Sequence, residues 1–287
     1  MNTFASGVKH SYYGKGDVVV YRLNRDGKTP AGQSPVFGAN VLMLIYGDAF
    51  LPTYITGDNT GLIATDSMKN FIQRETMNFD GYDLESFGRF LAEKFMHKYP
   101  QAAGIQISIN EVPYDGIVDG SIAFTPKGPE RASSRIEIGR SGTDLKLIDL
   151  TSGIQGFRLL RLGGSAFHGF VRDEYTTLPD ITNRPLHMWL DLEWTYGTPA
   201  AGYSEGAITA MVRRMVHEVF HGFESGSIQQ VIHQLGTKML ANIPAIEQIH
   251  LEANNRTWDT VAEQGNVLGV FTDPRPPYGC LGLTMKR

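Results

Sequence analysis

Apolar residues recur along the chain either at every second position, as in strands, or with a helical period. Each half of the chain shows the same order of strands, two helices and strands. In the first half, strands are predicted at residues 18–23, 41–47, 105–109, 121–125 and 134–139. Two helices are predicted between the second and third of these strands. Thr65 or Asp66 would cap the first helix and Asp83 the second, which ends at Pro100.

The second half repeats this order of strands, two helices and strands. Strands are predicted at residues 146–150, 157–162, 188–196, 246–253 and 267–272. One helix begins near Ser204, and the next runs from about Ser227 to Asn242. We therefore expect an α+β fold of two tandem units, residues 1–142 and 143–287, with a linker near 140–152. Each unit would be an antiparallel sheet with a helix pair on one face.

Composition narrows the classes of protein to which this chain can belong. Its 26 basic and 30 acidic residues give a net charge of −4, and no segment carries the basic excess that favours nucleic acid. The single cysteine, Cys280, rules out an internal disulfide and a multi-thiolate metal site. No run approaches the roughly 20 apolar residues that span a bilayer, and the N-terminus lacks a signal-peptide pattern. We expect a folded cytoplasmic protein without nucleic-acid or membrane partners.

The string HEVFH at 217–221 matches the HExxH pattern of zinc proteases, in which two histidines bind the metal and the glutamate activates water. On a helical wheel, however, His217 and His221 lie opposite the apolar stripe of the same helix. A third ligand is also missing, because Ser227 stands where the longer protease pattern has a histidine. We interpret the string as a solvated helix face and expect no metal site.

Five segments carry the most specific chemical information: YGKGD at 13–17, IATDSMKN at 63–70, FHGFVRDEYTTLPDITNR at 167–184, SIQQ at 227–230 and LEANNRTW at 251–258. In content, order and spacing they resemble the urate oxidase (uricase) family over nearly the whole chain. The resemblance implies a tandem tunnelling fold (T-fold) and four subunits around a central tunnel. It also implies cofactor-free oxidation of urate by dioxygen to 5-hydroxyisourate and hydrogen peroxide.

By this resemblance, Lys15 and Thr65 form a base dyad, and Asp66 lies beside them at the substrate. Without the resemblance, Lys15 would be interpreted as a solvated edge lysine, and Thr65 or Asp66 as a helix cap. A desolvated lysine has a lowered pKa, so its neutral amine can instead accept a proton from an acidic substrate N–H, relayed through the threonine hydroxyl.

The resemblance also assigns the walls of a purine pocket. Phe167 would stack on the ring, and Arg184 would present two parallel N–H donors to its anionic edge. Gln229 would hydrogen-bond the pyrimidine side of the ring. The backbone N–H of Ile228 and the side chain of Leu178 would complete the wall. The dyad of one subunit would face the pocket of a neighbouring subunit.

One segment departs from the family pattern. Where uricases have PNxH, this chain has Asn254, Asn255, Arg256 and Thr257, so the proline and the histidine are both replaced. Asn255 still corresponds to the asparagine that holds dioxygen or water above the ring. Thr257 takes the catalytic position of the histidine, but a hydroxyl cannot carry a proton near neutral pH as an imidazole does. The chain also ends in MKR and not in the peroxisomal SKL, which again favours the cytoplasm.

Three alternatives to urate oxidation stay open on the sequence. The enzyme could oxidise another purine-like or pteridine-like heterocycle, which oxygen uptake across a panel of rings would reveal. A non-catalytic homologue would bind urate analogues without consuming oxygen. A metal-dependent hydrolase of the wider T-fold group would hold metal after purification, and the single cysteine and the outward-facing HEVFH segment argue against it.

Overall fold

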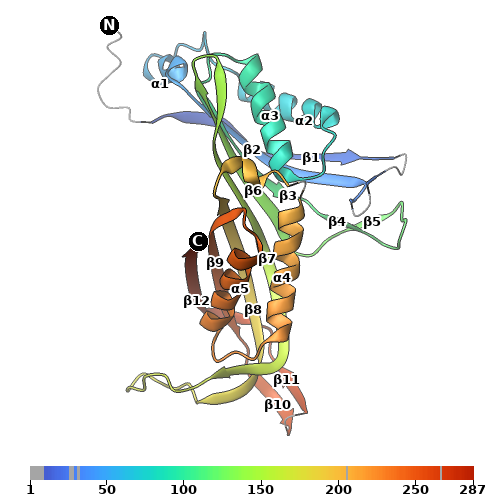
Figure 1. Cartoon of the computed structure of the whole chain (residues 1–287), viewed down its shortest axis with the longest axis vertical. Coiled ribbons are helices and arrows are strands. Elements are labelled where there is room, and N and C mark those ends of the chain that lie inside the picture. The colour runs from blue at the N-terminus through green and yellow to red at the C-terminus, as the bar shows by residue number, and fades with distance from the viewer. Residues whose placement is uncertain (1–9, 26–28, 31–32, 205, 266) are drawn as a thin grey trace. The chain divides into compact units, whose positions relative to one another are not determined.

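The computed structural model describes residues 10–25, 29–30, 33–204, 206–265 and 267–287 (Figure 1). Contacts within the chain divide it into two compact units. The first comprises Met1–Ser152 with Thr198–Ala207, and the second comprises Gly153–Gly197 with Ile208–Arg287. No described helix is long and apolar enough to cross a membrane.

The first unit is a sheet with helices α2 and α3 on one face (Figure 1). Its strands are β1 (Tyr12–Leu23), β2 (Val36–Tyr46), β3 (Gly104–Glu111), β4 (Tyr114–Gly116), β5 (Phe124–Pro126), β6 (Arg131–Ser141) and the start of β7 (Asp144–Phe167). Its helices are α1 (Leu51–Ile55), α2 (Thr65–Glu75) and α3 (Leu84–Lys98), with 3₁₀ turns η1 (Asp48–Phe50), η2 (Thr76–Asn78) and η3 (Pro199–Gly202). The strand order is β1-β2-β3-β6-β7, while β4 and β5 form a separate hairpin.

The second unit has the same kind of arrangement, with α4 and α5 as its helix pair (Figure 1). Its strands are the rest of β7, then β8 (Ile181–Tyr196), β9 (Ile246–Thr257), β10 (Thr260–Gln264), β11 (Leu268–Phe271) and β12 (Arg275–Lys286). Its helices are α4 (Ala207–Gly222) and α5 (Ile228–Asn242). The strand order is β7-β8-β9-β12, and β10 pairs with β11 in a separate antiparallel hairpin.

Apolar side chains at matching periods join each helix pair to its sheet. In the first unit, α3 packs on β3 and β6 and buries Phe87, Leu91 and Phe95, which recur at helical spacing. In the second unit, α5 packs on β9 and β12 and buries Val231 and Leu235. Each such side chain contributes about 1.5 to 3 kcal/mol through its removal from water, so most of the stability of the helices comes from this packing.

The predicted α+β fold of antiparallel strands and helix pairs is confirmed, although β4, β10 and β12 were not predicted and β5 and β7 differ from their predicted bounds. The predicted strands 146–150 and 157–162 are parts of the single strand β7, so residues 144–152 of the expected linker are strand, and the boundary between the two units falls directly after Ser152. Thr151 and Ser152 resemble loop residues in sequence but are buried within this strand. The predicted strand 121–125 is also largely wrong, because β5 begins only at Phe124.

Strand β12 was not predicted, because its sequence RPPYGCLGLTMK contains two prolines and two glycines. It pairs with β9 in a regular register from Gly279 opposite Asn255 to Lys286 opposite Gln248. Pro276 and Pro277 lie within the register shift that precedes this ladder, where their missing N–H groups break no regular pair.

One predicted helix cap is found, one is wrong, and a further cap was not predicted. Asp83 caps α3 by accepting a hydrogen bond from the Ser86 N–H at 2.8 Å, and Ser227 caps α5 by accepting one from the Gln230 N–H at 3.2 Å. Neither Thr65 nor Asp66 caps α2, because the cap residue is Ala64 and it makes no side-chain cap bond. Both therefore lie inside the first turn of that helix. The helix predicted to begin near Ser204 begins at Ala207.

A buried glutamate, Glu85, lies two residues after Asp83, the cap residue of α3. Glu85 is 5% exposed, and its carboxylate accepts a hydrogen bond from Ser152 Oγ at 2.6 Å. Burial nevertheless raises the pKa of Glu85 to about 7, since it outweighs the effect of that hydrogen bond, and the neighbouring Asp83 acts in the same direction as burial. The folded chain therefore binds a proton here that the unfolded chain releases near pH 4.5.

Glu85→Gln should remove a pH dependence of stability. Because the folded pKa lies above the unfolded one, the contribution of Glu85 is present below about pH 4.5 and is lost as the pH rises through about 7. The neutral glutamine carries no such loss, so the variant should gain about 1 to 3 kcal/mol of unfolding free energy over the parent between pH 5 and pH 8. Urea unfolding at both pH values measures this, and parallel pH profiles for the two proteins would contradict it.

Candidate functional site

Lys15 lies on β1 directly before a β-bulge. The register of β1 with β2 shifts between Lys15 and Val18, and Asp17 within the shift has a φ of 56°. Asn40 Nδ2 on β2 donates to Asp17 Oδ1 at 2.8 Å, which fixes this irregularity. Gly14 lies so close to the backbone of β2 that an added Cβ would fall 1.8 Å from the Met43 carbonyl oxygen. Bulges redirect side chains, so the segment YGKGD fixes the direction of a half-buried Lys15.

Thr65 and Asp66 are the first two residues of α2, which packs against β1. The segment before them is attached to β1, because the Ile63 N–H donates to the Tyr13 hydroxyl at 3.0 Å. A hydrogen bond from Lys69 at 2.6 Å and the charge of Lys69 lower the pKa of Asp66, and the charge of Lys15 acts in the same direction. The first unit therefore brings Lys15 into electrostatic contact with the start of α2.

The second unit contains a cavity of about 460 Å³. Its lining comes from the end of β7, the start of β8 and the loop between α4 and α5: Gly164, Ala166, Thr182, Asn183, Glu224, Ser225 and Gly226. These residues adjoin the predicted pocket residues in the chain, since Ala166 precedes Phe167, Asn183 precedes Arg184 and Gly226 lies two residues before Ile228. Pockets for small ligands have volumes of roughly 300 to 1,000 Å³. The cavity therefore suits a small molecule.

Arg184 lies on β8 with its guanidinium half-buried. Its Nε is buried and has no hydrogen-bond partner within the described part of the chain. Burial lowers the pKa of the Arg184 guanidinium, and no carboxylate among the described residues opposes this effect. A buried donor without an acceptor destabilises the empty protein, and an anion at this position would satisfy it.

Phe167 ends β7 and stacks on Phe170, with ring centroids 4.9 Å apart and an interplanar angle of 13°. Gly169, with φ at +74°, turns the chain between the two rings. Phe170 was not assigned from the sequence, although its place three residues after Phe167 across a glycine is a usable signal for such a pair. Leu178 lies in the segment after Phe170, is 41% exposed, and accepts a hydrogen bond from Arg172 through its carbonyl at 3.2 Å.

Ile228 and Gln229 form the first turn of α5. Ile228 is buried and Gln229 is exposed. Backbone N–H groups in the first turn of a helix lack partners inside the helix and carry a partial positive charge, so they attract anions and carbonyl oxygens. Gln230 does not serve a ligand in the same way, because its side chain accepts a hydrogen bond from the Gly226 N–H at 2.8 Å.

Asn255 lies on β9 opposite Met188 of β8. Directly opposite residues of an antiparallel pair share a face, and side chains alternate along a strand, so Asn255 lies on the same face of the sheet as Arg184. Thr257 is the last residue of β9 and pairs through its backbone with Arg275 of β12. The side chain of Thr257 lies outside the described part of the structure.

The HEVFH segment on α4 lies on the solvent-facing side of that helix, as predicted. His217 and His221 are exposed, and Glu218 pairs with Lys238 of α5 at 2.7 Å. Among the residues that the structure describes, no group of three histidine, cysteine, aspartate or glutamate side chains could hold a metal ion.

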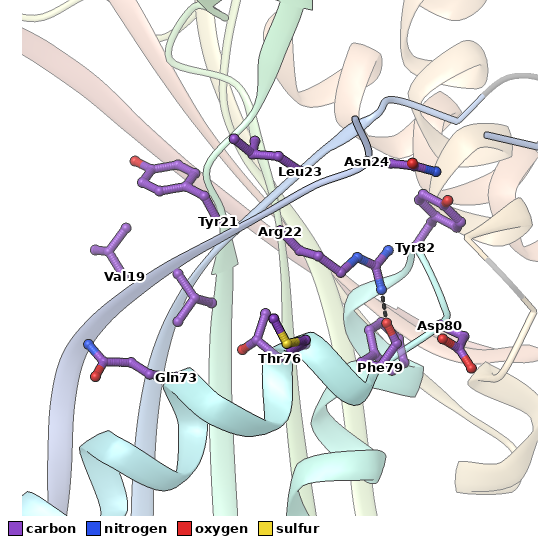
Figure 2. Close-up of a pocket in the computed structure, with 12 residues that line it drawn as sticks. Val19, Tyr21, Arg22, Leu23, Asn24, Gln73, Thr76, Phe79, Asp80 and Tyr82 are labelled. Atoms are coloured by element: carbon purple, nitrogen blue, oxygen red, sulfur yellow. Dashed lines mark hydrogen bonds between the residues drawn. The ribbon is translucent and has the colours of Figure 1, made fainter. Parts of the chain in front are cut away.

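A second cavity, of about 660 Å³, lies in the first unit between β1 and the segment from α2 to Tyr82 (Figure 2). As in the 460 Å³ cavity, none of the predicted site residues is among those that line it, and here none adjoins the lining residues in the chain. Figure 2 shows Arg22 directed from β1 toward Phe79, whose carbonyl accepts from Nη1, and Nη2 donates to the Gly81 carbonyl at 2.7 Å. The guanidinium of Arg22 is therefore engaged by backbone acceptors.

Comparison with known proteins shows to which proteins this chain is related. The protein-family model for uricase matches residues 150–279. Over 300 aligned residues the chain is 33% identical to the uricase of Haloferax volcanii, with 96% of this chain and 97% of that protein covered. The chain belongs to the uricase family. Its fold agrees with a hyperthermostable mutant of Bacillus sp. TB-90 urate oxidase at a TM-score of 0.86 and 33% identity, covering 96% and 99% of the two chains.

One group of relatives is longer than this chain. The uric acid degradation bifunctional protein PucL of Bacillus subtilis is 35% identical to it over 299 residues. That alignment covers 96% of this chain but 60% of PucL, and the same share of the corresponding Bacillus sp. TB-90 protein is covered. The chain therefore spans less than two thirds of the length of these two family members.

The predicted site residues of this uricase family member fall into two groups. Lys15, Thr65 and Asp66 belong to the first unit, where the charge of Lys15 acts on Asp66, and the other seven belong to the second: Phe167, Leu178, Arg184, Ile228, Gln229, Asn255 and Thr257. Phe167, Arg184, Ile228 and Gln229 lie close to the cavity lining along the chain, and Asn255 shares a sheet face with Arg184. Leu178 lies in an exposed segment, and the side chain of Thr257 lies outside the described part of the structure.

Proposed function

We propose that the protein is a urate oxidase, which converts urate and dioxygen to 5-hydroxyisourate and hydrogen peroxide. The observation that carries this proposal is the 460 Å³ cavity, whose lining residues adjoin Phe167, Arg184 and Ile228 in the chain. Membership of the uricase family supports the choice of urate as the ring.

The pocket would recognise urate as an anion. Arg184 would donate two parallel N–H groups to a carbonyl and a deprotonated nitrogen of the ring edge, and Phe167 would cover the ring face. Gln229 and the Ile228 N–H would bind the pyrimidine edge, and Asn255 would hold dioxygen or water over the ring. A closed pocket that orients both reactants removes much of the entropy cost of their encounter.

Lys15 and Thr65 would remove the substrate proton. Transfer of electrons from the urate anion to dioxygen and recombination at C5 would give a hydroperoxide. Addition of water and departure of hydrogen peroxide then leave 5-hydroxyisourate. Urate itself supplies the electrons, so the proposed reaction uses no cofactor.

The active assembly is proposed to be a homo-oligomer, most simply a tetramer. Strand β1 in the first unit and β12 in the second each have one neighbouring strand among those described. Unpaired strand edges favour association with another chain. The base dyad of one subunit would then serve the pocket of another. We also propose that residues 1–142 and 143–287 are repeats of one T-fold unit and that the protein acts in the cytoplasm.

The direct test adds urate to the purified protein with and without dioxygen while ultraviolet absorbance and peroxide release are followed. We expect urate loss and peroxide release in equal amounts, and only when dioxygen is present. Tight binding of urate without oxygen uptake would replace the proposal with that of a binding protein.

Thr257 favours a second candidate, an oxidase of another purine-like or pteridine-like ring, because this chain lacks the usual histidine. If urate is the substrate, Thr257→His should raise turnover of urate about 10-fold or more, since an imidazole of pKa near 6.5 exchanges protons with the oxygen-site water. If another ring is the substrate, the same change should slow its oxidation and leave urate a poor substrate. Turnover of a panel of rings by the parent, Thr257→His and Thr257→Ala measures this. Unchanged rates in all three would place Thr257 outside the oxygen site.

A further inference from the structure

Arg161 on β7 joins the end of α4 to two parts of the chain that line the 460 Å³ cavity, the α4–α5 loop and the end of β7. Its Nη1 donates to the carbonyls of Phe220, at 3.1 Å, and of Phe223. Its Nη2 donates to the Gly164 carbonyl at 2.7 Å and to Ser225 Oγ at 2.8 Å. One guanidinium therefore connects the end of α4 and the α4–α5 loop to the end of β7.

The same loop is attached to β7 by its backbone. The Ser225 N–H donates to the Gly164 carbonyl at 2.9 Å, and the Ala166 N–H donates to the Ser225 carbonyl at 2.7 Å. Phe167 follows Ala166 directly, and Ile228 and Gln229 come three and four residues after Ser225. The attachment thus lies between the aromatic ring and the start of α5, which are the two sides of the proposed pocket.

We propose that Arg161 is a positioning residue for the substrate pocket: it fixes the first turn of α5, with the Ile228 N–H and Gln229, relative to the ring of Phe167. This inference rests on the proposed function for its ligand. Its physical basis is the planar fork of the guanidinium, which serves four acceptors at fixed angles. A lysine ammonium at the same position is a point charge and cannot hold them all.

The first unit offers a matched control. Arg22 on β1 makes the same kind of contact, with the carbonyls of Phe79 and Gly81 in the loop between α2 and α3. That loop leads to the Asp83 cap of α3 and to no predicted ligand of the ring. Arg22→Lys therefore removes a comparable contact without changing the start of α5.

The experiment compares Arg161→Lys with Arg22→Lys by amide hydrogen exchange and by urate kinetics. In Arg161→Lys we expect faster exchange at residues 225–230 and unchanged exchange at residues 235–242. KM for urate and Kd for 8-azaxanthine should both rise about 10-fold to 100-fold, with a smaller change in kcat, because small misplacements of binding groups are costly. Arg22→Lys should keep the parental KM and Kd.

The outcomes separate the two proposals. Parental exchange at residues 225–230 in a folded Arg161→Lys variant would overturn the positioning role, as would a parental KM and Kd in a chain that oxidises urate. If the parent neither binds nor oxidises urate, the proposed function fails, and the exchange rates alone decide whether Arg161 holds the start of α5. If Arg161→Lys does not fold, Ser225→Ala removes one of the four acceptors and takes its place in the same measurements.

Discussion

Arg184→Ala is expected to weaken binding of an inert purine anion such as 8-azaxanthine by about 30-fold to 1,000-fold. The loss of a charge-assisted, two-pronged contact in a closed pocket costs about 2 to 4 kcal/mol. The buried Nε of Arg184, which has no partner in the described part of the chain, is the structural reason for expecting this contact. Calorimetric titration measures the change.

Two further variants make this test specific. Arg184→Lys should not restore binding, because an ammonium lacks the fork that matches two adjacent ring atoms. Arg214→Ala removes an exposed arginine of α4 and should leave the affinity unchanged. Parental affinity in Arg184→Ala would show that Arg184 lies outside the pocket.

Lys15→Ala is expected to lower urate turnover by about 100-fold to 10,000-fold, the usual contribution of a positioned general base. Binding of an inert anion should change much less, because Lys15 is proposed to move a proton and not to hold the ring. Lys94→Ala removes a lysine of α3 that pairs with Glu75 of α2, away from the predicted site residues, and serves as the control. Equal losses in the two lysine variants would contradict a base role for Lys15.

Mixed oligomers test where the base comes from. Co-assembled Lys15→Ala and Arg184→Ala subunits should recover part of the activity, because some sites then combine an intact dyad with an intact pocket of another subunit. No recovery after verified co-assembly would mean that each chain builds its site from its own residues.

Much of the fold follows from local patterns in the sequence, and the errors have physical causes. The helices α3 and α5 were predicted almost to the residue. In α3 the Asp83 cap coincides with apolar residues at helical spacing, and α5 was bounded by Ser227 and by the helix-breaking Pro244. The long strand β7 was divided in the prediction because Thr151 and Ser152 are polar, and their burial depends on distant partners such as Glu85. Strand β12 was missed because proline and glycine have a low strand propensity; it forms because it pairs with β9.

The candidate site was predictable only in part. Family motifs placed Lys15 next to the start of α2, and the structure has their charges interacting. The prediction that Thr65 or Asp66 caps α2 was wrong. Residue type alone does not show whether a residue is the cap or one of the first residues inside the helix, and here both lie inside it. The contacts of Arg161 could not be predicted, since three of its four acceptors are backbone carbonyls, which every residue type carries.

The segment Thr198–Ala207 belongs to the first unit although it follows β8 of the second. Its Tyr203 ring lies 4.9 Å from the guanidinium carbon of Arg89 on α3. A nascent chain emerging from the ribosome therefore cannot finish its first unit when Ser152 appears, because the last part arrives only with residue 207. By then β8 has been synthesised together with its neighbour β7, but its other neighbouring strand, β9, is still to be made. During translation, unpaired strand edges of both units are therefore exposed at the same time. Because the first unit consists of two separate segments, cleavage at a single peptide bond would not release it complete.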